Sequence, residues 1–408
     1  MSQIDDFVKI LNDISRTLSL ELDSPKNLIQ YVKDNKLLSY SDKKAFIDDI
    51  NKSIFYDQLN AKKHDEKFKK LNAKCINCQY DLYENFYCIM CVRSYLENNF
   101  TKWTSGNKIL DSGIRFSQLK YSAGLNIVEW IPFENFFIHG HKTDGGYGSI
   151  YVAYWIDGPI YSWNDYENQF LRGGSTLVIL KSMRNFNNQN EDFYKEVLVH
   201  IMLTSEIPHL IKCYGLTKDP ENENYMMVLS YAFDGDLKDF LKKNNFTWKE
   251  RYSLLCDITL ALLKLHEHDI IHRDLHPGNI LITGNSWKIG DLGISKFSDD
   301  KSKSEIIGVL PYIAPEALIG SDYTTAVDIY SIGIIMWQIV CNHVPYWDRN
   351  HDISLARDIY FGLRPPKIPG LLIGYEEIME KCWNSDASFR PSALELYEFS
   401  KKNYQEIC

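Results

Sequence analysis

The sequence Ile271-His272-Arg273-Asp274-Leu275-His276-Pro277-Gly278-Asn279-Ile280-Leu281 stands in the second half of the 408-residue chain. It follows a leucine-rich segment, residues 252–266, whose apolar spacing is typical of a helix. Asp291-Leu292-Gly293 begins twelve residues after Asn279, and Ala314-Pro315-Glu316 follows it. Three short motifs in a fixed order make this region the most informative part of the sequence.

Upstream of this region, from about residue 133, the chain changes to short runs rich in β-forming residues. Residues 143–151 form a glycine-rich turn between two apolar runs, and such glycines let backbone amides approach a polyphosphate. The loop glycines are Gly145, Gly146 and Gly148. A β-branched run then ends in Lys181, and a predicted helix over residues 191–204 carries Glu196. Taken singly, each feature has an ordinary explanation, such as a common hairpin or a lysine extending to solvent.

In their order along the chain, these features resemble the signature set of eukaryotic protein kinases, over about residues 133–404. The resemblance implies an α+β protein of two lobes, with a small antiparallel sheet and one helix in the first lobe and mainly helices in the second. It implies that ATP binds between the lobes and that its γ-phosphate passes to a protein hydroxyl.

The resemblance also assigns roles to single residues. The glycine loop covers the phosphates, Lys181 pairs with the α- and β-phosphates, and Glu196 holds Lys181 in place. Asn279 and Asp291 would ligate Mg²⁺ or Mn²⁺, and Asp274 would orient the substrate hydroxyl and accept its proton. Positions matching the adenine pocket are Ile150, Ile179 and Leu281, with Leu229 as gatekeeper and Ser230, Tyr231 and Ala232 as the hinge.

Further positions match structural and regulatory parts of the family. Asp328 matches the aspartate that ties down the catalytic loop, and Glu316 and Arg390 match a buried ion pair. Arg273 is of the type that binds a phosphate on the activation loop. We expect that phosphate on Ser302 or Ser304; an ordinary solvated loop is the alternative.

Some positions depart from the usual pattern and bear on the acceptor. His276 stands where serine/threonine kinases usually carry lysine, and Val309 stands where they carry threonine. Gly308 and Tyr312 fit the serine/threonine pattern better than the tyrosine pattern, so we expect serine or threonine as acceptor. A tyrosine or dual-specificity kinase, and a pseudokinase scaffold without transfer, are the alternatives.

Composition limits the partners and the location. The chain has 45 Lys+Arg against 54 Asp+Glu, a formal charge of −9, so no basic excess favours nucleic acid. The first residues lack the basic-then-apolar order of a signal peptide, and no apolar run reaches the length of a membrane span. We therefore expect a cytoplasmic protein whose partners are ATP and a protein substrate.

Four cysteines upstream of the kinase-like region form the pattern C-x2-C-x9-C-x2-C. They are Cys75, Cys78, Cys88 and Cys91. Two such pairs can place four thiolates at the corners of a tetrahedron, which favours a structural zinc knuckle over residues 73–92. A redox pair and chance are the alternatives.

The rest of the N-terminal part is expected to divide in two. Residues 1–72 show apolar stripes at helical spacing, and residues 93–132 look like a connector with little core of its own. The N-terminal region is a candidate for binding a protein partner. The segment Cys382–Pro391 resembles the tyrosine-kinase-like group, and Glu129-Trp130-Ile131-Pro132 with the double knuckle resembles the expanded kinase family of arbuscular mycorrhizal fungi.

Overall fold

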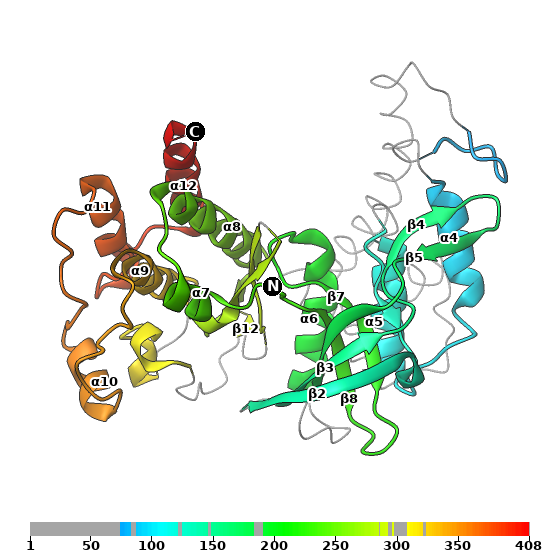
Figure 1. The fold of residues 1–408 in the computed structure, drawn as a ribbon, viewed down its shortest axis with the longest axis horizontal. Helices are drawn as coiled ribbons and strands as arrows, with labels where there is room; N and C mark the ends of the chain where they lie inside the picture. The colour runs from blue at the N-terminus through cyan, green and yellow to red at the C-terminus, as the bar shows by residue number, and fades with distance from the viewer. Residues whose placement is uncertain are drawn as a thin grey trace, which may run out of the picture. The chain divides into compact units, whose positions relative to one another are not determined.

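The computed structural model describes residues 74–82, 87–120, 125–145, 148–182, 191–284, 286–292, 296–297, 308–320 and 324–407. They form two compact units (Figure 1). The sheet unit holds the described residues up to 205 and residues 212–231, and the helical unit holds residues 206–211 and those from 232 onward. A sheet-rich unit and a helical unit confirm the predicted α+β class. The helices expected in residues 1–72, Gly146, Ser302 and Ser304 lie outside the described residues.

Six strands of the sheet unit form one sheet, in the order β1–β7–β8–β6–β3–β2. They are β1 (Glu129–Trp130), β2 (Phe136–Gly145), β3 (Gly148–Trp155), β6 (Thr176–Ser182), β7 (Cys213–Lys218) and β8 (Tyr225–Ser230). All neighbours are antiparallel except β1 and β7. Alternate side chains share one face of a sheet, and here that face is apolar and buried. Its central residues are Ala153, Val178, Leu180 and Val228.

A second hairpin is inserted between β3 and β6. Its strands are β4 (Ile160–Asn164) and β5 (Gln169–Arg172), and helix α4 (Ile89–Asn99) packs against it (Figure 1). Tyr95 of α4 meets the rings of Trp163 and Phe170 edge-on, at centroid distances of 5.2 Å and 5.2 Å. Because these aromatic rings form a shared core, the cysteine-containing segment belongs to the sheet unit.

Two longer helices complete the sheet unit, α5 (Lys108–Lys120) and α6 (Glu191–Glu206). Helix α5 lies in the segment predicted to be a connector with little core, yet Leu110 and Ile114 are fully buried. The segment therefore has core positions that the sequence did not predict, because the serine and glycine residues within it disfavour a helix. The predicted domain boundaries themselves stay predictions.

The helical unit is built around α8 (Trp248–Glu267), which begins with a capping box in which Thr247 and Glu250 exchange hydrogen bonds. Helix α12 (Ala393–Ile407) runs beside it, with Tyr252 and Phe399 in edge contact at 6.0 Å (Figure 1). The other helices are α7 (Leu237–Lys243), α9 (Ala326–Cys341), α10 (Ile353–Tyr360) and α11 (Ile373–Cys382). Helix α9 is buried along most of its length.

No helix among the described residues combines the length and the apolar character that crossing a lipid bilayer would require.

Candidate functional site

The loop that carries Asp274 is anchored by a buried carboxylate on α9. Asp328 is fully buried and accepts hydrogen bonds from the backbone N–H groups of His272 and Arg273, each at 2.9 Å. His266 at the end of α8 is 2.9 Å from the same carboxylate. Arg273 has a φ of +72°, a strained conformation for a long side chain. The two N–H bonds to Asp328 hold that conformation, so the predicted tethering role agrees with the geometry.

The Asp274 carboxylate has two different oxygens. Oδ2 accepts a hydrogen bond from Nδ2 of Asn279 at 3.3 Å and lies 3.7 Å from Nε2 of His276. Oδ1 is buried and has no hydrogen-bond partner among the described residues. Burial acts to raise the pKa of Asp274, but His276 outweighs it and holds the pKa below its usual range. A carboxylate that is held ionised, with one oxygen that has no hydrogen-bond partner among the described residues, can accept a hydrogen bond from a hydroxyl.

Gly308 lies directly beside Oδ1 of Asp274. Its φ of +121° belongs to the region that favours glycine, and a Cβ there would stand 3.2 Å from Oδ1 of Asp274. A larger residue would therefore crowd the approach to Asp274.

A short hairpin brings Asn279 near Asp291. Strands β10 (Ile280–Thr283) and β11 (Ser286–Ile289) pair with Ile280 opposite Ile289, and the N–H of Gly290 donates to the carbonyl of Asn279 at 2.8 Å. Asp291 follows Gly290 directly, so both predicted Mg²⁺ ligands lie at the same end of this hairpin. The amide nitrogen of Asn279 points to the carbonyl of Asp274 at 2.8 Å, which leaves its side-chain oxygen for a cation. The residues present therefore fit an oxygen-ligated divalent ion.

In the sheet unit, several predicted ATP-contacting residues share one face of the sheet. Ile150 is paired with Lys181 across β3 and β6, and Ile179 is paired with Leu229 across β6 and β8. Since Ile179 and Lys181 are two residues apart on one strand, all four lie on the face opposite the apolar core. Lys181 is only 5% exposed there.

The remaining predicted positions are on neighbouring elements. Gly145 and Gly148 are paired at the end of the β2–β3 hairpin, and position 196 is on α6. Ser230 ends β8, its N–H donating to the carbonyl of Lys212 at 2.8 Å, and Tyr231 and Ala232 follow. Leu281 is on β10 of the helical unit.

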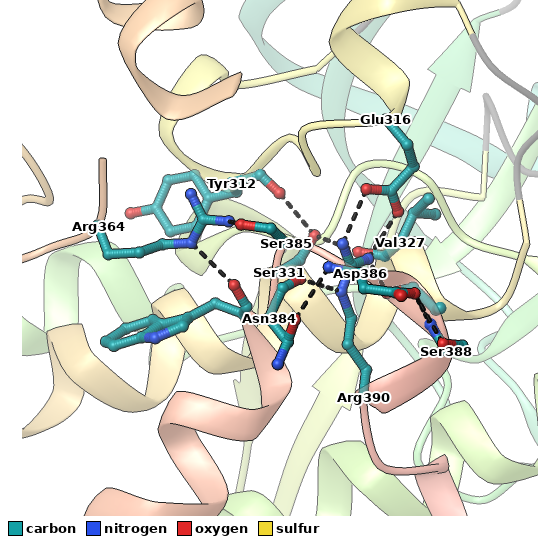
Figure 2. A network of polar contacts seen from close by, with 12 residues as sticks. Tyr312, Glu316, Val327, Ser331, Arg364, Asn384, Ser385, Asp386, Ser388 and Arg390 are labelled. Carbon is teal, nitrogen blue, oxygen red and sulfur yellow. Dashed lines mark hydrogen bonds and ion pairs between the residues drawn. The ribbon is translucent and has the colours of Figure 1, made fainter. Parts of the chain in front are cut away.

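A polar network joins Glu316 to the C-terminal segment (Figure 2). Two nitrogens of Arg390 donate to the two carboxylate oxygens of Glu316, at 2.6 Å and 2.8 Å. Arg390 also donates to the carbonyls of Ala326 and Asn384. The guanidinium groups of Arg364 and Arg390 both make cation–π contacts with the ring of Tyr330. Their central carbons lie 5.2 Å and 5.3 Å from the ring centroid. Sequence reasoning found the ion pair but missed these partners, because a tyrosine inside an apolar helix carries no local signal.

The four cysteines converge as predicted. Their sulfurs all lie within 4.8 Å of one another, with 3.5 Å from Cys75 to Cys91 and 3.2 Å from Cys78 to Cys88. Burial raises the pKa of Cys88 to about 12, so a cation is needed to stabilise the thiolate form. Four thiols at this spacing fit a tetrahedral metal ion.

Residues of the inserted hairpin lie against this cluster, and sequence reasoning missed them. Nδ2 of Asn77 donates to Oδ1 of Asn168 at 3.0 Å and to the carbonyl of Asp165. Sγ of Cys75 is 4.0 Å from Oδ1 of Asp165. The turn between β4 and β5 thus supplies the polar surroundings of the cysteine cluster.

Comparison with known proteins gives a consistent result. The family described as protein tyrosine and serine/threonine kinase matches residues 143–399. A probable LIM domain-containing serine/threonine-protein kinase of Dictyostelium discoideum is 30% identical over 266 residues, 64% of this chain and 39% of that protein. A putative serine/threonine-protein kinase/receptor of Acanthamoeba polyphaga mimivirus is 27% identical over 296 residues, 71% of this chain and 16% of that protein.

A human relative, ankyrin repeat and protein kinase domain-containing protein 1, is 29% identical over 205 residues, 46% of this chain and 26% of that protein. The chain therefore spans less than half the length of these three relatives. The family match covers more than half of the chain and includes every motif from the glycine loop to Arg390. The chain belongs to the protein tyrosine and serine/threonine kinase family.

Proposed function

We propose that this chain is an active protein kinase that transfers the γ-phosphate of ATP to a serine or threonine hydroxyl of a protein. The observation that carries the proposal is Asp274, a partly buried carboxylate with a lowered pKa, one oxygen of which has no hydrogen-bond partner among the described residues. That oxygen is the acceptor that a substrate hydroxyl requires.

The transfer step follows from the assigned residues. The hydroxyl oxygen forms a bond to the γ-phosphorus, the bond from phosphorus to the bridging oxygen of ADP breaks, and the hydroxyl proton passes to Asp274. Asn279 and Asp291 would hold Mg²⁺ or Mn²⁺, which supplies positive charge to the phosphate oxygens when bound. Lys181, positioned by Glu196, would pair with the α- and β-phosphates, beneath the glycine loop.

The adenine ring is assigned to the same face of the sheet as Lys181. Ile150, Ile179 and Leu229 would supply apolar contacts there. The kinase resemblance assigns Leu281 to the same ring. The backbone of Ser230, Tyr231 and Ala232 would bond the polar edge of the ring. Arg273 is assigned to a phosphate on the activation loop, and phosphorylation of Ser302 or Ser304 stays a prediction.

The acceptor class rests on two supports. Gly308 and Tyr312 match the serine/threonine pattern, and the three relatives compared include two named serine/threonine-protein kinases. We also assign the chain to the tyrosine-kinase-like group because of its closing segment, Cys382–Pro391. The resemblance to the expanded kinase family of arbuscular mycorrhizal fungi belongs to the same proposal.

We assign zinc to the four cysteines, in a structural role. All four ligand positions of a tetrahedral ion would be filled by thiolate, so no open position would serve a reaction. The cytoplasm is the proposed location, because ATP and reduced thiols are both present there. The partners proposed are a protein substrate and, for the N-terminal region, a second protein.

The test is incubation of the full chain with Mg-ATP, followed by mapping of phosphosites by mass spectrometry. An Asp274→Asn variant is the control, since it keeps the shape of the side chain and loses the charge. We expect phosphoserine or phosphothreonine in the wild type, and a loss of at least about 100-fold in the variant. Phosphotyrosine would overturn the acceptor class. Absence of phosphate, with ATP binding shown by calorimetry, would replace the enzyme with a pseudokinase scaffold.

A further inference from the structure

We propose that the metal held by the four cysteines positions helix α6, and with it position 196, which the kinase resemblance pairs with Lys181, so that phosphoryl transfer depends on a metal site remote from the chemistry. The inference rests on the proposed kinase function. It goes beyond a structural zinc knuckle because it makes the knuckle, the inserted hairpin and α5 positioning elements for the reaction. Every contact in the argument lies within the sheet unit.

The first contact joins the cysteine cluster to α4. Cys88 is the residue before α4, and Cys91 is in its first turn. The N–H of Val92 donates to the carbonyl of Cys88 at 3.1 Å. A metal bound to both cysteines would therefore fix the beginning of this helix. The β4–β5 hairpin packs against the same helix through the ring of Tyr95. Helix α4 would therefore be held both by the metal at its beginning and by the hairpin along its side.

The second contact joins α4 to α5 through two arginines that reach in opposite directions. Nη2 of Arg93 on α4 donates to the carbonyl of Leu119 at 2.9 Å. Nη2 of Arg115 on α5 donates to the carbonyl of Phe100 at 2.7 Å. Arg115 also lies over the rings of Phe100 and Trp103, at 5.6 Å and 5.2 Å. Each arginine bonds the C-terminal end of the other helix, a favourable site for a cation, so the two helices are held in one register.

The third contact joins α5 to α6. Gly113 lies so close to Leu198 that a Cβ at position 113 would be 2.2 Å from a methyl carbon of that leucine. Leu198 is fully buried. The hydroxyl of Ser205, near the end of α6, donates to the carbonyl of Asn126 just after α5, at 3.1 Å. Helix α6 is thus held near its C-terminal end by the hydrogen bond of Ser205, and α5 packs closely against its middle at Leu198.

The contact of α5 with Leu198 bears on position 196 because of where the two positions lie around α6. Successive residues of a helix are rotated by about 100°, so positions 196 and 198 are about 200° apart around the axis. Helix α5 therefore packs on the side of α6 opposite position 196. A shift of α5 would move position 196 directly, and a displacement of 1 Å in a positioning group can cost about 100-fold in rate.

The cysteine segment depends on metal to take part in this chain of contacts. Outside the cysteines, residues 74–82 are mostly exposed, including Ile76 and Tyr80. Such a short segment cannot fold on an apolar core of its own, and a metal ion bound by its cysteines would supply the missing stability. Metal removal should therefore release the beginning of α4 and loosen α5 against α6.

The test measures hydrogen exchange and kinetics on the full chain, with zinc bound and after chelation. Chelation should increase amide exchange in α4, α5 and residues 197–205 of α6, and leave α8 and α9 unchanged. It should lower kcat by about 100-fold, and added zinc should restore kcat. A Cys341→Ser variant, which changes a cysteine outside the cluster, is the matched control and should respond to zinc like the wild type.

An Arg115→Met variant tests the link separately from the metal. It keeps the apolar length of the side chain but loses the bond to Phe100, so it should still bind one zinc ion while α6 exchanges faster and kcat falls. Unchanged exchange in α6 and unchanged kcat after zinc loss would overturn the proposal, as would the absence of bound zinc. If α6 responds to zinc but no phosphate is transferred, the kinase function fails and the mechanical link stands.

Discussion

Arg390 and Glu316 form a two-point ion pair in which the arginine side chain is fully buried and the glutamate side chain is 20% exposed. The pair joins residue 316, at the end of the Ala-Pro-Glu motif, to a residue 74 positions later in the chain (Figure 2). Arg390 also donates to two backbone carbonyls, so all parts of its guanidinium are used. The segment that precedes α12 is therefore joined directly to the Ala-Pro-Glu motif.

Removal of Glu316 should destabilise the helical unit strongly. The variant Glu316→Ala leaves the buried guanidinium of Arg390 without its counter-charge, and such losses cost about 3–5 kcal/mol. Glu316→Gln keeps one hydrogen bond and should cost less. Glu267→Gln, in the exposed pair with Lys264, is the control and should cost less than about 1 kcal/mol. Urea unfolding followed by circular dichroism measures all three, and equal costs for Glu316→Ala and Glu267→Gln would contradict the expectation.

The tether of the catalytic loop predicts a kinetic effect. In Asp328→Asn, one of the two N–H donors of the loop faces an amide nitrogen instead of an acceptor oxygen. The φ of +72° at Arg273 then loses part of its support. We expect kcat to fall by about 100-fold with little change in the KM for ATP, because Asp274 is displaced while the sheet unit is unaffected. Steady-state kinetics at several ATP concentrations separates the two constants. A rise in KM with unchanged kcat would count against the tether.

The His276 ring predicts a second kinetic effect. Its Nδ1 accepts the N–H of Gly278 at 3.0 Å, and its Nε2 faces Asp274. His276→Asn preserves an acceptor for Gly278 but removes the group beside the carboxylate, so kcat should fall by about tenfold, or 1.4 kcal/mol. His276→Lys places a hydrogen-bond donor with a positive charge near Asp274 and should recover part of the loss. If both variants match the wild type, His276 has no part in the reaction.

Much of the catalytic region could be predicted because it is local in sequence. Asp274 and Asn279 are in one loop, and the short β10–β11 hairpin brings Asp291 close to Asn279. The order of the motifs along the chain therefore predicts that these three residues lie together. The ion pair between Glu316 and Arg390 is distant in sequence, and only the family resemblance indicated it.

The docking of the cysteine segment could not be predicted in the same way. Nothing in the pattern of residues 160–172 indicates that Trp163 and Phe170 will enclose Tyr95, because a single sequence contains no information on which apolar surfaces pair. Helix α5 was missed for a related reason. Gly113 lowers helix propensity, but the close contact with Leu198 requires a residue without a side chain. Tertiary packing outweighed the local preference.

The capping box of α8 predicts a pH-dependent contribution to stability. Thr247→Ala removes the hydroxyl that accepts the N–H of Glu250, which should cost about 1 kcal/mol. Hydrogen bonds from Thr247 hold the pKa of Glu250 below its usual range. A lowered folded-state pKa contributes stability above the unfolded value of about 4.3, and that stability is lost as the pH falls through the folded value. The difference between wild type and Glu250→Gln should therefore be complete at neutral pH and shrink in acid. Thermal unfolding at a series of pH values checks it, and a constant difference would contradict the assignment.

The hairpin core should determine both stability and metal retention. Trp163 is buried and meets Tyr95 and Phe170 edge-on, so Trp163→Ala removes the centre of the cluster and should cost about 3–5 kcal/mol. Trp163→Phe keeps an aromatic ring and should cost less. Because the same hairpin supplies Asp165 and Asn168 beside the cysteines, zinc should also leave Trp163→Ala faster than the wild type when a competing chelator is added. Tyr161→Ala, at an exposed position of the same strand, is the matched control. Equal rates of zinc loss from Trp163→Ala and Tyr161→Ala would show that the hairpin does not hold the cysteine cluster.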